Sequence, residues 1–94
     1  MPAADKFPTT IDAAVRALLG LVPAEELEKI TRMSEGDLIN LHLGLGQWIR
    51  NNFGLWKENV ELMQASGASD PDDASGVIIK ALWQRLRDDL PKIH

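Results

Sequence analysis

One short segment gathers the residue types that most often carry binding chemistry. Its members are Trp48, Arg50, Asn51, Asn52, Trp56 and Lys57. An arginine guanidinium binds carboxylates and phosphates through two parallel hydrogen bonds. Tryptophan is enriched at protein interfaces and stacks on nucleic-acid bases. We therefore expect this segment to contact either a protein partner or a small anionic ligand.

A structural role for the same segment stays open. Arg50 would then pair with an acid at the start of the last helix, Asp72 or Asp73, and join two helices. Asn51 and Asn52 would lie at a helix end, where asparagine caps the helix or tolerates the left-handed conformation. Both roles can coexist in one protein, because a side chain that joins helices can also border a binding surface.

The chain has three tryptophans, which is many for so small a core. Tryptophan is seldom fully buried. We expect Trp83 to pack in the core. Trp56 follows a glycine-containing turn and precedes polar residues, so we expect it to be partly exposed. A ring in that position could stack on a partner.

His42 is a second candidate, because it lies near the middle of the apolar face of a predicted central helix. Imidazole titrates near neutral pH and can serve as a proton-linked switch or a general base. The alternative is a core histidine whose ring nitrogens meet a carbonyl or an aspartate. We carry His42 forward as a possible buried switch.

Three aspartates, Asp70, Asp72 and Asp73, resemble a metal site only superficially. They lack the glycine, the alternating ligands and the terminal glutamate of a calcium loop. Helix capping explains their positions. The sequence also lacks a nucleophile elbow, a phosphate-binding loop, a dinucleotide motif and a zinc-binding helix. We therefore expect a non-enzymatic protein without metal or cofactor.

Composition narrows the class of protein further. The chain has 94 residues, 45% hydrophobic and 26% charged, which is typical of one small globular domain. It has no cysteine, so disulfides and thiolate metal sites are excluded. A net charge of −4 disfavours duplex nucleic acid as a partner. With no apolar run long enough for a membrane span and no signal-peptide pattern, we expect a cytoplasmic protein.

Hydrophobic periodicity and capping residues predict helices throughout the chain. The predicted helices cover residues 10–19, 23–32, 35–52, 59–66 and 71–89. We expect an all-α bundle of about four to five helices, with long central (35–52) and C-terminal (71–89) helices. A flexible leader at 1–8 would precede a single helical domain at 9–90.

Several strings in the chain resemble a small uncharacterised helical domain family of bacteria and their phages. The most specific is Arg-Asn-Asn-Phe-Gly-Leu-Trp at residues 50–56, and two others begin at Met33 and Pro71. The resemblance covers roughly residues 10–87. It implies a compact helical domain and supplies no established activity, although the phage association suggests a small inhibitor or a ligand-capturing protein.

Three functions follow from these observations. The first is a protein-interaction module that binds a partner or itself, because the chain carries more apolar and tryptophan surface than it can bury. The second is a protein that binds a nucleotide-like anion. Lys80 or Arg85 would add positive charge to that binding site. The third is an enzyme that uses His42. We rank them in this order.

Overall fold

The computed structural model describes residues 7–89, and every regular element in that range is a helix. The predicted all-α bundle is therefore confirmed. The elements are α1 (Ile11–Leu21), α2 (Ala24–Arg32), η2 (Glu35–Leu41), η3 (His42–Gly46), α3 (Gln47–Asn52), α4 (Val60–Ser66) and α5 (Pro71–Asp88). Pro91, predicted to end the last helix, lies outside the described residues.

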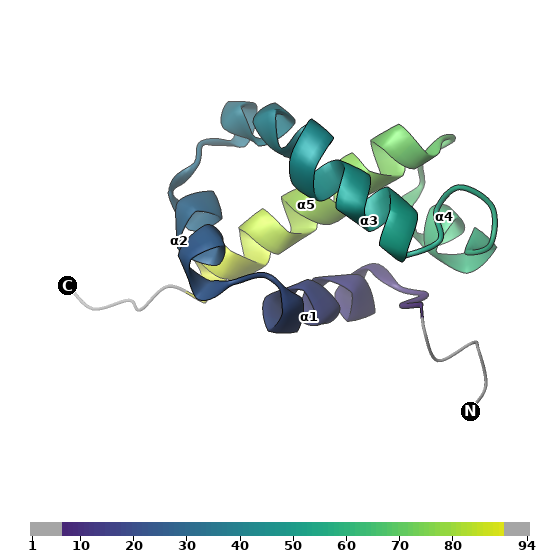
Figure 1. Ribbon diagram of the computed structural model, residues 1–94, viewed down its shortest axis with the longest axis horizontal. Helices are drawn as coiled ribbons and strands as arrows, with labels where there is room; N and C mark the ends of the chain where they lie inside the picture. The colour runs from purple at the N-terminus through teal and green to yellow at the C-terminus, as the bar shows by residue number, and fades with distance from the viewer. Residues whose placement is uncertain (1–6, 90–94) are drawn as a thin grey trace.

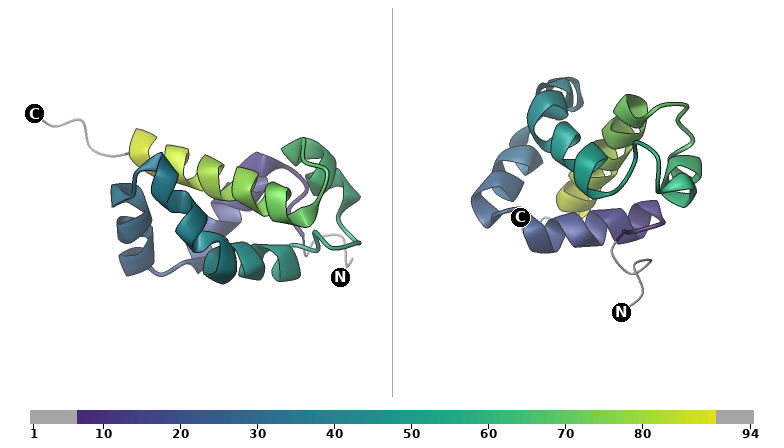
Figure 2. Two further views of the ribbon diagram at one scale, coloured as in Figure 1. Left: turned by 90° about the horizontal axis from the view of Figure 1, so that it is seen from above. Right: turned by 45° about the vertical axis from the view of Figure 1, so that its right-hand side comes forward.

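The longest helix, α5, is the axis of the bundle. It contacts all six other elements, and Figure 1 shows it passing behind α3 with α1 below, α2 at one end and α4 at the other. The two turned views in Figure 2 show the same arrangement. Its residues Ile78 and Leu82 are completely buried, as are Leu18 of α1, Ile49 of α3 and Leu62 of α4. One core thus forms around α5.

Local capping signals set the ends of most helices where the sequence predicts them. The side chains of Thr10 and Asp70 accept hydrogen bonds from Ala13 N at 3.0 Å and Asp73 N at 2.8 Å. These bonds satisfy backbone donors that the first helical turn leaves unpaired. Gly67 ends α4 with a φ of 74°, a conformation that glycine adopts without steric cost.

The predicted central helix at 35–52 is helical but not one regular α-helix. It begins as a 3₁₀ helix (η2), continues as a π-helix (η3) and becomes α-helical only at Gln47. A 3₁₀ helix is wound more tightly than an α-helix and a π-helix more loosely. The winding therefore changes along the segment, and Leu38 near its start and Ile49 near its end are both buried. Gly44 and Gly46 lower the α-helical preference of this segment.

Asn59 links the loop after α3 to the start of α4. Its Nδ2 donates to Phe53 O and to Pro8 O, each at 2.8 Å, and its Oδ1 accepts from Leu62 N at 3.2 Å. The predicted flexible leader thus has contacts at its end. Pro8 bonds to Asn59, and the ring of Phe7 lies against Gly54, whose φ is 69°.

We expect Asn59→Ala to lower the free energy of unfolding by about 2–3 kcal/mol, because it removes a helix cap and leaves buried backbone groups unpaired. Urea denaturation followed by circular dichroism measures the change. Asn52→Ala is the control, since Asn52 is exposed and makes a single side-chain bond, to Trp48 O at 2.9 Å. Equal losses in the two variants would contradict a special role for Asn59.

Candidate functional site

The guanidinium of Arg50 lies inside the protein, between α3 and α5. Arg50 is 5% exposed. Its Nη1 donates to Ser75 Oγ at 3.0 Å, and its Nη2 donates to His42 O at 3.4 Å. Its Nε lies 3.3 Å from Asp72 Oδ1, but the N–H does not point at that oxygen and makes no hydrogen bond. Asp72 therefore supplies a nearby charge rather than a directed bond.

Gly46 leaves the space that this guanidinium occupies. A Cβ at this position would lie 3.2 Å from Arg50 Nη1 and 3.4 Å from Leu41 O. The first distance is shorter than an ordinary van der Waals contact, and the second is at the lower limit of one. Of the two roles that the sequence leaves open for Arg50, the structure shows the joining of two helices. The buried side chain is directed at α5 rather than at a site open to ligands.

The two asparagines beside Arg50 also bond within the protein. Asn51 Oδ1 accepts from Trp56 Nε1 at 2.7 Å, and Asn52 Nδ2 donates to a backbone carbonyl of its own helix. Trp56 is 56% exposed, in agreement with the sequence-based expectation. Its polar edge is satisfied by Asn51, so the part of the ring that faces solvent is apolar.

The predicted site residues do not come together in one place. Trp48 lines a groove beside α2, whereas Trp56 and Lys57 line a separate shallow pocket beside α4. Arg50 lies in the interior between α3 and α5. The predicted site residues therefore do not form a single ligand-binding pocket.

His42 is half-buried, so the expectation of a buried switch needs correction. It lies in the π-helical segment, where its ring borders a shallow pocket together with Ile39 and Ile79. In that pocket, Lys80 Nζ and Glu35 Oε2 form an ion pair at 2.8 Å. His42 is thus neither fully enclosed in the core nor fully exposed.

An apolar groove of about 510 Å³ lies between two groups of helices. One wall comes from the junction of α1 and α2, and the other from η2, η3 and α3. The residues that line it are Leu21, Val22, Pro23, Glu26, Ile30, Asn40, Leu41, Gly44, Leu45 and Trp48. We call it the α2–α3 groove.

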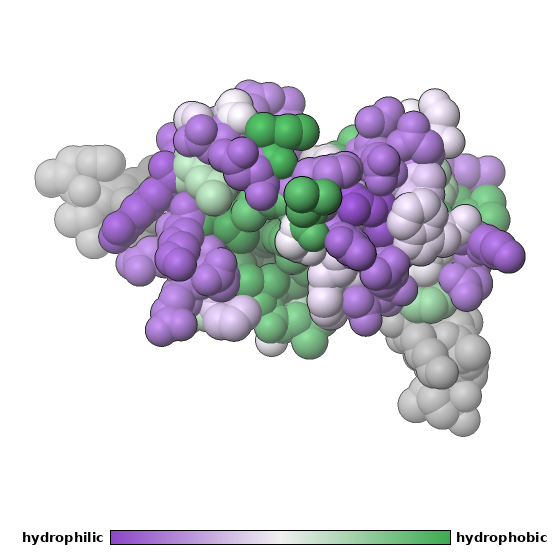
Figure 3. Space-filling model, turned by 45° about the horizontal axis from the view of Figure 1, so that its top comes forward, coloured by the Kyte–Doolittle hydropathy of each residue, from purple (hydrophilic) through white to green (hydrophobic). Residues whose placement is uncertain are grey.

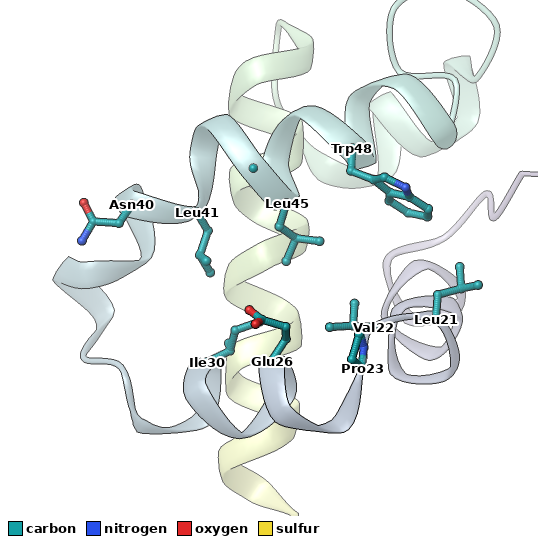
Figure 4. Close-up of a pocket in the computed structure, with 10 residues that line it drawn as sticks. Leu21, Val22, Pro23, Glu26, Ile30, Asn40, Leu41, Leu45 and Trp48 are labelled. Carbon is teal, nitrogen blue, oxygen red and sulfur yellow. The ribbon is translucent and has the colours of Figure 1, made fainter.

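The close-up in Figure 4 shows how side chains from the two walls face one another. Leu41 and Leu45 point down from the upper wall toward Ile30 and Val22, and the ring of Trp48 extends toward the Leu21 end. Trp48 is held from behind by Phe53, with ring centroids 5.6 Å apart in an edge-to-face arrangement. Figure 3 shows hydrophobic side chains filling this hollow between two hydrophilic flanks.

Sequence reasoning identified Trp48 but missed the rest of the groove. The wide apolar arc of the central segment was a signal, because it includes Leu41 and Leu45. The opposite wall had no such signal. Leu21 and Val22 follow Gly20, where the first helix was expected to have ended, whereas α1 continues to Leu21.

A family model described as Domain of unknown function (DUF6794) matches residues 7–86. The chain belongs to the DUF6794 family. Comparisons with curated proteins and with solved structures gave no significant match. The match of the DUF6794 model covers the groove, the buried Arg50 and all of the described helices except the end of α5.

Within residues 7–89, no group of three or more His, Cys, Asp or Glu side chains is placed to hold a metal ion. None of the helices in that range is long and apolar enough to cross a membrane.

We expect Arg50→Ala to lower the free energy of unfolding by about 2–4 kcal/mol, through a lost buried side chain and the lost hydrogen bonds to Ser75 Oγ and His42 O. Asp72→Asn should cost less than about 1 kcal/mol, because an ion pair with one exposed partner contributes little. Chemical denaturation measures both. If Asp72→Asn costs as much as Arg50→Ala, the ion pair rather than the bond to Ser75 holds α3 on α5.

Proposed function

We propose that this DUF6794 domain is a non-enzymatic protein-interaction module, and that the α2–α3 groove is its docking surface. The observation that carries the proposal is the groove itself, which is open and lined almost entirely by apolar side chains. Contiguous exposed apolar surface is the usual mark of a binding site on a small monomeric domain. Trp48 supplies the kind of aromatic anchor on which binding energy concentrates.

Two of the side chains that line the groove are themselves exposed to solvent. Leu21 at one end is 60% exposed and Trp48 is 38% exposed. Full burial of a leucine-sized side chain stabilises a complex by about 1.5–3 kcal/mol. A partner that covers this surface therefore gains binding free energy mainly from the hydrophobic effect, and hydrogen bonds to Asn40 or Glu26 at the rim would add specificity.

The geometry favours an apolar partner over a small anion. Arg50 is enclosed, and the two cations expected to assist it are engaged elsewhere. Lys80 pairs with Glu35 at 2.8 Å, and Arg85 Nε pairs with Asp89 Oδ2 at 3.1 Å. An anion bound near Trp56 could thus contact Lys57, but it could not reach the guanidinium of Arg50, whose two parallel hydrogen bonds the anion-binding hypothesis requires.

The cellular setting of this function rests on the sequence alone. A cytoplasmic location and an origin among bacteria and their phages are part of the proposal, because the composition and the resembling strings favour them. In that setting, a domain of this size would act by binding to a surface of another protein or of a second copy of the same chain.

A photo-cross-linking amino acid at position 48 tests the proposal in cells that naturally express the domain. We expect discrete adducts from position 48 and none from position 61, since Glu61 is exposed on α4, away from the groove. Leu45→Lys in the same chain should abolish the adducts, because it places a charge in the apolar wall. Adducts that form equally from both positions, or that survive Leu45→Lys, would refute docking in the groove.

A further inference from the structure

The residues next to the α2–α3 groove indicate what occupies it. We propose that its partner is the same face of a second copy of the chain, so that two copies form a two-fold symmetric dimer. This inference rests on the proposed function, because it names the partner for the same groove. Four features of the described residues support it: a ridge beside the groove, an absence of charge, an open glycine and the available area.

A ridge of apolar side chains stands beside the groove on the same helical segment. Ile39 and Leu43, one turn apart, are 72% and 78% exposed. Leu41 and Leu45, which line the groove, alternate with them along the chain. Figure 3 shows hydrophobic side chains projecting next to the hydrophobic hollow. Each copy therefore carries both a protrusion and a depression, which a two-fold interface requires because each patch must fit itself.

The segment that carries the ridge has no charged side chain of the Asp, Glu, Lys or Arg type from Leu38 to Ile49. Charged residues make up 26% of the chain, and its net charge is −4. Two copies repel one another wherever their acidic surfaces meet. An uncharged segment allows two copies to meet without that repulsion, and depletion of charge is typical of the centre of an interface.

The one charged side chain that lines the groove, Glu26, is compatible with this arrangement. It lies on the α2 wall, with Lys29 Nζ 3.5 Å from its carboxylate. A second copy would place its uncharged ridge opposite this wall rather than another acid. A strongly cationic partner, by contrast, could pair only with the carboxylate of Glu26 in the groove, and that carboxylate already has Lys29 beside it.

Gly44 is an exposed residue of the groove lining, next to Leu43 of the ridge in the sequence. A Cβ at this position would meet nothing within 4 Å, so the packing of the single chain does not require a glycine here. A missing side chain at this point lets the ridge of a second copy approach the backbone closely. At Gly46, by contrast, the guanidinium of Arg50 in the same chain lies close to where a Cβ would be.

A stable dimer would need only a modest share of the molecular surface. A standard interface buries about 800 Å² on each partner. The accessible surface of the protein is 6100 Å², so the dimer would cover roughly one eighth of it. The longest and second principal extents are 45 and 29 Å, which leaves room for a contact of this size on the grooved face.

Sedimentation equilibrium and native mass spectrometry of the whole chain test this proposal. We expect a dimer of twice the 10.4 kDa chain mass. Leu43→Lys should raise the dimer dissociation constant about 100-fold or more, since the two-fold axis repeats the substitution and each copy loses roughly tenfold. Gly44→Lys should act in the same way, because its added side chain projects into the groove.

Val60→Lys is the matched control. Val60 is 58% exposed on α4, so the substitution adds the same charge to an exposed apolar position outside the groove and ridge. We expect this variant to stay dimeric. Circular dichroism and urea denaturation confirm that all three variants fold.

Two results would overturn the inference. One is a wild-type chain that stays monomeric up to about 1 mM. The other is a dimer that survives Leu43→Lys and Gly44→Lys, which would place the contact elsewhere. A monomer whose position 48 still cross-links to a different protein would refute the dimer and keep the proposed function. A monomer that forms no specific adducts would refute both.

Discussion

The fold depends on the burial of one positive charge. A guanidinium removed from water must have partners close by, since an unpaired buried charge is highly destabilising. Arg50 meets this need with Ser75 of α5 and with the carbonyl of His42 in the π-helical turn. These contacts join three elements at one point. Because Leu45 and Trp48 lie on the same segment, the position of the groove wall follows from the position of Arg50.

The same constraint accounts for the irregular winding of the central segment. A side chain at Gly46 would be crowded by Arg50 Nη1, which would have to shift by a few tenths of an ångström. The π turn places the carbonyl of His42 within reach of Nη2, and it leaves the imidazole ring half exposed. π-Helical turns are rare and often lie at functional sites. In this domain the irregular turn lies between the core, which it helps to hold, and the groove, which it borders.

Local signals made part of this structure predictable from sequence. Thr10, Asp70 and Gly67 act through bonds or backbone angles within a few residues, and the helix ends at these positions were predicted. The pairing of Arg50 with Asp72 was one of two interpretations left open. The sequence shows an acid at the start of α5, but it does not give the distance between that acid and Arg50. The groove could not be predicted, since its walls come from α1–α2 and from η2–α3, and their separation depends on how each of these elements packs on α5.

The exposed groove has a thermodynamic consequence for a domain of this size. A short chain buries a smaller fraction of its surface than a long one, and its folded state is only marginally stable. Apolar side chains such as Leu43 that stay in solvent contribute nothing to the core, yet they expose the protein to non-specific association. Any partner that binds only the folded chain raises its apparent stability by mass action. If the proposed docking occurs, folding and binding are coupled in this domain, because the apolar surface left over from the core around α5 is the surface that a partner would bury.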